Sequence, residues 1–100
     1  MNSQSLILLK DKDQMIGYIW YEKIKSNFTN KQMSYILDSY VEESERGKGY
    51  GRILINKLKE KMKEEGIDRI DLSVSKSNKA RQLYEKEGFE TTMMRMSINI

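Results

Sequence analysis

The sequence predicts a mixed α/β sandwich with at least one β-α-β crossover. Three observations carry this prediction: short runs of β-branched and aromatic residues before the glycine-rich stretch, a helical period of apolar residues over positions 49–65, and a strict alternation of apolar and polar residues at the C-terminus. The expected order of elements is strand, strand, strand, helix, strand, helix, strand.

The first two strands are expected to form a hairpin. Residues 5–9 make a short apolar run, and residues 15–24 are rich in β-branched and aromatic side chains, with the polar residues 10–13 between them. After a polar loop around Phe28, residues 34–41 give the third strand, which runs into an acidic turn.

The remaining elements are predicted from the spacing of apolar residues and from the residues that end helices. Over residues 49–65 the apolar side chains fall on one face of a helix, and Gly66 is the expected residue after its end. Residues 70–74 alternate as a half-buried strand does. A short helix over residues 79–87 then precedes a last strand, which covers residues 94–100.

The size of the chain predicts one small globular domain, residues 1–100. With 38% hydrophobic and 33% charged residues, it has material for one core and no second one. The longest uninterrupted apolar run, residues 6–9, is far below the roughly 20 residues of a membrane span. Charged residues follow that run at once, unlike a signal peptide, so we expect a cytoplasmic protein.

The chain contains no Cys and no His. This composition removes disulfides, thiolate nucleophiles, Ser-His-Asp triads and the usual zinc sites, so we expect no metal. Any chemistry must use Tyr, Ser, carboxylates, Lys, the backbone or water.

A glycine-rich segment, residues 46–51, lies between the third strand and the first helix. Three glycines at alternate positions let the backbone adopt positive φ and approach a ligand closely, while the start of the helix adds free N–H groups and the positive end of its dipole. This geometry binds a phosphate or diphosphate. The pattern G-x-x-x-x-G-K-[ST] does not occur, and G-x-G-x-x-G fails because Arg52 stands at its last position. The alternative is a tight turn without a ligand.

The segment Arg46-Gly-Lys-Gly-Tyr-Gly51, after a strand ending in Val41, resembles the acyl-CoA diphosphate loop (R/Q-x-x-G-x-G/A) of the GNAT acetyltransferase superfamily. Residues 78–89 are similar to its second signature, N-x-x-A-x-x-x-Y-x-x-x-G-F, except that Ala80 sits one place early. The resemblance runs from about Ser5 to the C-terminus. It implies a GNAT-like central mixed sheet that lacks the usual N-terminal strand and two helices.

The resemblance implies an N-acetyltransferase that moves an acetyl group from acetyl-CoA to a primary amine by direct attack in a ternary complex. It implies that the backbone of Tyr40 and Val41 holds the pantetheine arm and that Asn78 bonds near it. Tyr84 matches the general acid that protonates the leaving thiolate, which suits a phenol because phenols are protonated at neutral pH. The implied cofactor-binding residues are Tyr40, Val41, Arg46, Gly47, Lys48, Gly49, Tyr50, Gly51, Arg52, Asn78 and Tyr84.

The identity of the general base is the question that the resemblance leaves open. In the subgroup that acetylates protein N-termini a glutamate stands where this chain has Ser73. Asp38 and Tyr40 are therefore the remaining candidates to steer a water that removes the amine proton, and on a regular strand they share one face. The alternative is that Asp38 is only a solvated strand residue. Asp38, Glu42 and Glu43 on the acceptor side suit a cationic amine.

Two other functions remain as alternatives. One is a non-catalytic acyl-CoA-binding or interaction module that has lost its acceptor site. The other is a nucleic-acid binder, which the sequence disfavours because its lysines follow one helix without stacking residues among them. On the structural side, Tyr84 could be an ordinary core residue, and we interpret Tyr18, Trp20 and Tyr21 as core and sheet packing rather than as an acceptor-binding box.

The length of the chain also predicts its assembly. Strands lie at both ends of a short chain, and the absence of the family's first helices is expected to leave apolar sheet surface. We therefore expect a homodimer through the N-terminal hairpin or through residues 93–100.

Overall fold

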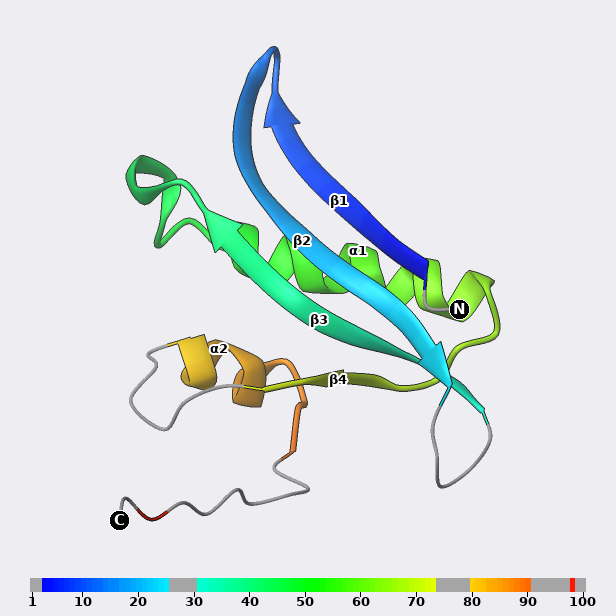
Figure 1. Cartoon of the computed structure of the whole chain (residues 1–100). Helices are drawn as coiled ribbons and strands as arrows, with labels where there is room; N and C mark the ends of the chain where they lie inside the picture. The colour runs from blue at the N-terminus through cyan, green and yellow to red at the C-terminus, as the bar shows by residue number, and fades with distance from the viewer. Residues whose placement is uncertain (1–2, 26–30, 74–79, 91–97, 99–100) are drawn as a thin grey trace.

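A computed structural model of the chain describes residues 3–25, 31–73, 80–90 and 98 (Figure 1). Four strands form one sheet in the order β1-β2-β3-β4. The strands are β1 (Ser3–Asp11), β2 (Gln14–Lys25), β3 (Gln32–Val41) and β4 (Ile70–Leu72). The first three run antiparallel to one another and β4 runs parallel to β3. The mixed α+β prediction is thus confirmed, while the expected last strand lies outside the described residues, apart from residue 98.

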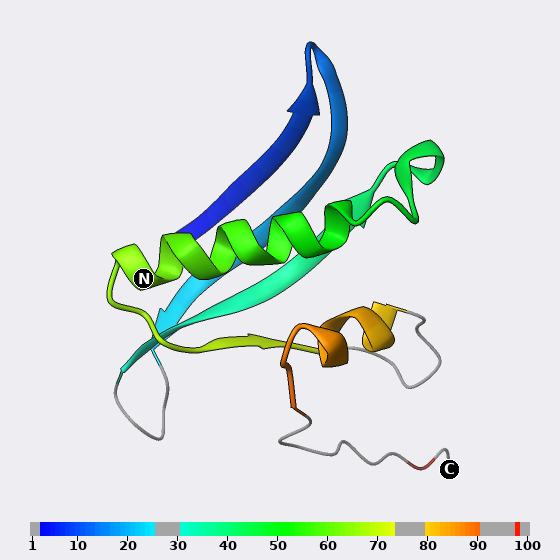
Figure 2. The same ribbon diagram turned by 180° about the vertical axis from the view of Figure 1, so that it is seen from behind.

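Helical segments follow β3 and β4 as predicted. They are the 3₁₀ turn η1 (Glu43–Glu45) and the α-helices α1 (Tyr50–Glu64) and α2 (Ala80–Lys86). Figure 2 shows α1 lying across one face of the sheet, with α2 beside β4. Neither described helix combines the length and the apolar character that crossing a bilayer requires.

The core lies between α1 and the sheet. The buried residues of α1 recur with the period of a helix, and Leu58 is 0% exposed. They pack with Ile19 and Tyr21 of β2 and with Ile36 of β3. The helix ends as predicted, because Gly66 has a φ of +75° and donates its N–H to the carbonyl oxygen of Lys63.

The opposite face of β1, β2 and β3 carries no helix within the described part of the chain. Leu6, Leu8 and Trp20 point to this face and are 53%, 45% and 41% exposed. Of the aromatic residues of β2 that were expected in core and sheet packing, Tyr21 lies in the core and is 1% exposed, whereas Trp20 lies on the outer face of the sheet. The reason is the alternation of side chains along a strand, which sends neighbours to opposite faces.

The edge of β3 is paired over only part of its length. The ladder with β4 joins residues 34–36 to residues 70–72 and goes no further. Directly after this ladder, Leu37 is an extra residue on β3, because Trp20 pairs with Asp38 and Tyr21 pairs with Ile36. Such a β-bulge bends a strand and increases its twist. Beyond it, no described strand pairs with this edge of β3.

Candidate active site

The free edge of β3 presents main-chain polar groups. The N–H of Glu42 donates to the carbonyl oxygen of Ile16 on β2 at 2.8 Å. Since antiparallel residues alternate in the direction of their main-chain groups, those of Ser39 and Val41 point away from β2, to the free edge. The Nε of Arg46 donates to the Val41 carbonyl oxygen at 2.9 Å, which agrees with this direction. An extended polar ligand can pair along such an edge as an added strand.

The glycine-rich loop joins this edge to α1. Gly47 and Gly49 have φ values of +80° and +86°, in the left-handed region that the sequence predicted for them. Gly49 is the N-cap of α1 and supplies no side-chain cap. The N–H groups of the first turn of α1 therefore have no acceptor within the helix, and they form a positive pole next to the free edge of β3.

Gly51 plays a different role from the one predicted. It lies within α1, and positive φ is found at Gly47 and Gly49 of the loop but not at Gly51. A Cβ at Gly51 would lie 2.8 Å from the Cδ2 of Leu83 in α2. This glycine therefore allows α2 to pack closely on α1.

The three basic side chains of this region have protein partners. Arg46 lies over the ring of Tyr40, with its Cζ 5.5 Å from the centroid, a cation–π geometry. Lys48 pairs with Glu45, with 3.0 Å between Nζ and Oε2, and this hydrogen bond raises the pKa of Lys48. The Nε of Arg52 lies 3.1 Å from a carboxylate oxygen of Glu87, while 70% of the Arg52 side chain is exposed.

Tyr84 lies on the helix side of the free edge. Its side chain is buried, and its hydroxyl lies 2.7 Å from the Oγ of Ser39, so that one of the two donates to the other. Its ring meets Phe89 edge-on, with centroids 5.7 Å apart. The end of α2 is fixed to α1 because the Nζ of Lys59 donates to the main-chain oxygen of Glu87 at 2.8 Å. The position of the phenol is thus set by α1, α2 and β3 together.

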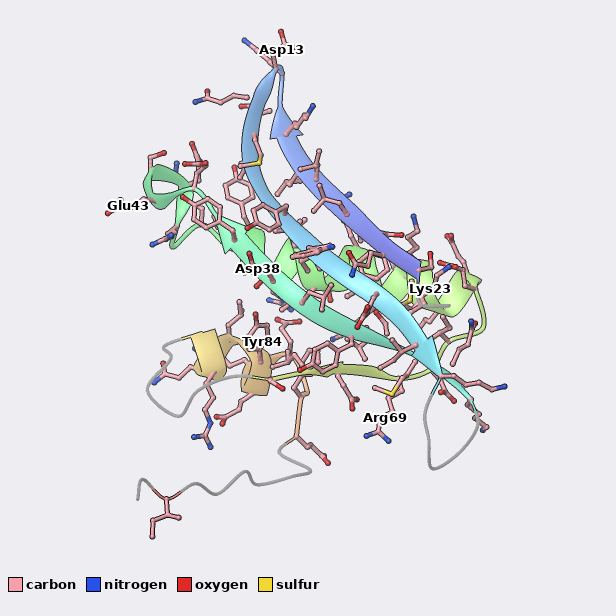
Figure 3. The ribbon with its side chains drawn as sticks, viewed as in Figure 1. Asp13, Lys23, Asp38, Glu43, Arg69 and Tyr84 are labelled. Carbon is pink, nitrogen blue, oxygen red and sulfur yellow. The ribbon has the colours of Figure 1, made fainter. Side chains whose placement is uncertain are left out.

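Asp38 and Tyr40 lie on the opposite, open face of β3 and share it, as expected from strand alternation. Both contact Tyr18 of β2: the Tyr18 hydroxyl donates to Oδ2 of Asp38 at 2.6 Å, and the rings of Tyr18 and Tyr40 lie 5.8 Å apart. The hydrogen bond to Asp38 is the main cause that raises the pKa of Tyr18. Asp38 is therefore bonded to its neighbour and is more than a solvated strand residue. In Figure 3, Asp38 lies on β3 and Tyr84 on α2 below it.

Ser39 and Tyr18 are site residues that the sequence analysis did not identify. Ser39 has no motif around it that marks it, and its partner is far away in the chain. Tyr18 was interpreted as packing, and only its place opposite Tyr40 in the hairpin pairing could have indicated a polar role. Ser73, where the subgroup has a base, is hydrogen-bonded to the hydroxyl of Tyr35. Asn78 lies outside the described residues.

The arrangement has two chemically different sides. Ser39 and Asp38 are neighbours on a strand, so their side chains point to opposite faces. A group bound at the free edge of β3 would therefore meet the phenol of Tyr84 from the helix side and the carboxylate of Asp38 from the open side. A proton donor and a proton acceptor on opposite sides of one bound group are what acyl transfer to an amine needs.

Comparison with known proteins assigns the chain to a family. Residues 1–89 match the acetyltransferase (GNAT) family, and the chain belongs to that family. It is 34% identical over 87 residues to the [ribosomal protein bS18]-alanine N-acetyltransferase of Haemophilus influenzae, and 33% identical over 90 residues to the uncharacterized N-acetyltransferase YycN of Bacillus subtilis. These matches cover 87% and 89% of the chain, and the chain spans 56% of the length of each relative.

Solved structures agree with this assignment. The chain superposes on the crystal structure of a predicted acetyltransferase with acetyl-CoA from Clostridium acetobutylicum, with a TM-score of 0.78 and 28% identity. The match covers 96% of this chain and 64% of that one. The fold is therefore that of the GNAT acetyltransferases.

Proposed function

We propose that the chain is an N-acetyltransferase that uses acetyl-CoA to acetylate a primary amine. The observation that carries this proposal is the free edge of β3 between the Tyr84 phenol and the Asp38 carboxylate, with a left-handed glycine loop at its end. The Clostridium acetobutylicum structure, whose description includes acetyl-CoA, supports this choice of acyl donor.

The donor would bind along the loop and the free edge. The pantetheine arm pairs with the main chain of Val41 and Ser39 as an added strand, in place of the Tyr40 backbone that the resemblance implied, because the main-chain groups of Tyr40 point to β2. The diphosphate lies at the first turn of α1, where the backbone from Lys48 to Arg52 supplies N–H groups to an anion. Binding at the edge displaces the Arg46 guanidinium from the Val41 carbonyl oxygen, which frees a positive charge for the diphosphate. Gly47, Tyr50 and Asn78 complete this proposed set.

The reaction is a direct transfer. The amine nitrogen attacks the thioester carbonyl carbon, a C–N bond forms, and the C–S bond breaks. Tyr84 donates its hydroxyl proton to the departing thiolate and regains one from solvent. The proton that the amine loses passes to a water held by Asp38 and Tyr40 on the open face. No covalent acyl-enzyme is needed, and the chain has no Cys to form one.

Thiol release from acetyl-CoA tests the proposal. The purified chain is incubated with acetyl-CoA and a panel of primary amines, including a peptide with an N-terminal alanine, because the Haemophilus influenzae relative is named for acetylating an alanine. We expect thiol release that depends on both the protein and the amine. Binding of CoA in calorimetry without amine-dependent release would instead indicate the binding-module alternative, and absence of CoA binding would contradict both.

A further inference from the structure

One main-chain oxygen at the free edge of β3 has a side-chain partner in the loop that follows the strand. The Nε of Arg46 donates to the carbonyl oxygen of Val41 at 2.9 Å, and the guanidinium lies over the ring of Tyr40, with its Cζ 5.5 Å from the centroid. The chain between the two partners runs through η1, so the side chain returns to the end of β3. Arg46 therefore occupies part of the edge along which an extended ligand would pair.

The partners of Arg46 differ from those of the other basic side chains of the loop. Lys48 pairs with the carboxylate of Glu45, and Arg52 pairs with that of Glu87. Arg46 pairs with no carboxylate of the described residues, and its partners are a neutral carbonyl and an aromatic ring. A phosphate offers a guanidinium two parallel hydrogen bonds between opposite charges, which a single carbonyl oxygen does not. An anion at the loop therefore draws Arg46 away from Val41.

We propose that Arg46 makes donor binding depend on the diphosphate, and that it thereby selects CoA thioesters over phosphate-free pantetheine thioesters. The resemblance implies only that Arg46 binds the diphosphate. The contact with Val41 adds a second role, in which the same guanidinium competes with the pantetheine arm for the edge of β3. The inference rests on the proposed function and names a residue that sets donor specificity at the same site.

The main chain of Arg46 lies beside the proposed diphosphate site. Its N–H donates to the carbonyl oxygen of Glu43 at 3.3 Å, and its φ and ψ of −72° and 153° are extended. Gly49, the N-cap of α1, follows three residues later. A turn of the exposed Arg46 side chain thus exchanges the Val41 oxygen for an anion at the first turn of α1, while the main chain of the loop keeps its conformation.

The two halves of the donor act on Arg46 in opposite ways. The pantetheine arm is uncharged, so it takes the place of the guanidinium at the edge and gives it no new partner. Its affinity is therefore reduced by the free energy of the contact between Arg46 and Val41. The diphosphate gives the guanidinium a charged partner and frees the edge. Each half therefore favours the binding of the other.

Two fragments of CoA test this coupling without any acetyl transfer. Pantetheine is titrated into the chain by calorimetry, with and without saturating inorganic pyrophosphate, while sodium chloride keeps the ionic strength equal. We expect pyrophosphate to tighten pantetheine binding about three- to tenfold, the change that corresponds to one hydrogen bond. Pantetheine should tighten pyrophosphate binding by the same factor, because coupling between two sites is reciprocal.

Arg46→Met removes the guanidinium at an exposed position and keeps an unbranched side chain, so folding is expected to persist. Pantetheine alone should then bind about three- to tenfold more tightly, and its coupling to pyrophosphate should vanish. The preference for CoA over pantetheine should fall about tenfold or more, because charged hydrogen bonds to the diphosphate are lost.

Arg69→Met is the matched control, because it removes the same charge elsewhere on the surface. Arg69 pairs with Asp71 of β4, and Figure 3 shows it far from Glu43 and the glycine-rich loop. We expect this variant to keep the coupling between pantetheine and pyrophosphate at its wild-type value.

The Nε–H group of Arg46 reports the contact directly. Its NMR signal is assigned by its loss in Arg46→Met. We expect pyrophosphate alone to shift this signal, whereas sodium chloride at the same ionic strength should leave it in place. An unshifted signal at saturating pyrophosphate would show that the guanidinium stays at the edge, and would overturn the inference.

The outcomes separate this inference from the proposed function. Equal pantetheine affinity with and without pyrophosphate, absence of pantetheine binding under both conditions, or coupling that persists in Arg46→Met overturns the inference. If the fragments couple through Arg46 but no amine releases thiol from acetyl-CoA, the inference stands and acetyl transfer fails. If acetyl transfer occurs without the coupling, the proposed function stands and this inference fails.

Discussion

The hydroxyl groups of Ser39 and Tyr84 lie 2.7 Å apart and join β3 to α2 at the unpaired edge of the sheet. The contact fixes the phenol beside the strand along which an acyl donor would bind. Since a hydroxyl both donates and accepts, Ser39 can hold Tyr84 with its proton directed away from the strand or toward it.

Tyr84→Phe is expected to lower turnover about 10²- to 10⁴-fold, because it removes the proton donor and keeps the ring. The free energy of unfolding should fall by only about 0.5–1.5 kcal/mol, the usual net value of one hydrogen bond. Thiol-release kinetics and urea unfolding measure the two effects. Ser39→Ala is the matched control, because it removes the same hydrogen bond but leaves the phenol, and its turnover should fall much less. Equal losses in the two variants would show that the contact matters rather than the acid.

Gly49→Val is expected to weaken CoA binding in calorimetry, because a β-branched residue disfavours the φ of +86° that aims the loop at its ligand. Holding a β-branched residue in the left-handed conformation costs about 1–2 kcal/mol or more in stability. Gly66→Val is the control, since Gly66 has a φ of +75° at the far end of α1 and, like Gly49, has open space around it. Both variants should lose stability and only Gly49→Val should lose CoA affinity. Similar CoA affinities in the two variants would argue against the phosphate-binding loop.

The Tyr18–Asp38 pair predicts a dependence of stability on alkaline pH. The hydrogen bond to Asp38 raises the pKa of Tyr18 above its ordinary value of 10.0 in the folded state. The folded chain therefore holds this proton more tightly than the unfolded chain, so the stabilisation is fully present below pH 10 and is lost as the pH rises through the folded pKa. An NMR titration of ring-labelled tyrosines measures the shift, and Asp38→Asn should return the pKa of Tyr18 toward its ordinary value. An unchanged Tyr18 titration in that variant would contradict the assignment.

The outer edge of β1 predicts self-association. Among the described strands β1 is the end strand, and alternate residues of its nine direct main-chain groups to a side where no described strand pairs with them. We expect two copies to pair through this edge. Light scattering over a concentration series, combined with amide exchange, tests this, because outward-facing amides of β1 should gain protection as dimer forms. A monomer at every concentration would contradict pairing at β1.

Local elements could be predicted from the sequence, and long-range contacts could not. The helix expected over residues 49–65 is found at Tyr50–Glu64, and the hairpin strands expected over residues 5–9 and 15–24 are found with longer ends, because period and turn residues are local signals. The bulge at Leu37 has no such signal, since neither Gly nor Pro marks it.

In the candidate site, too, local features could be predicted and long-range contacts could not. The left-handed conformations of Gly47 and Gly49 follow from residue type, whereas the partners of Tyr84 and Asp38 lie 45 and 20 positions away in the sequence. No spacing rule connects residues so far apart. The close packing of Gly51 on Leu83 was missed for the same reason, because a glycine that admits a neighbouring helix resembles one that permits a turn.

The edge of β3 stays open because the strand contains one extra residue at Leu37, and the type of side chain at that position does not matter. The main-chain groups that point to the β4 edge belong to residues 34 and 36 before the bulge and to residues 39 and 41 after it. Removing Leu37 would therefore restore a regular strand in which all four residues keep this direction. A chain that lacks this one residue could extend the β3–β4 ladder into the gap. We expect such a deletion to raise the melting temperature and to abolish CoA binding in calorimetry, whereas substitutions of Leu37 would leave the gap in place. In this fold, one surplus residue in β3 separates an open strand edge from a longer β3–β4 ladder.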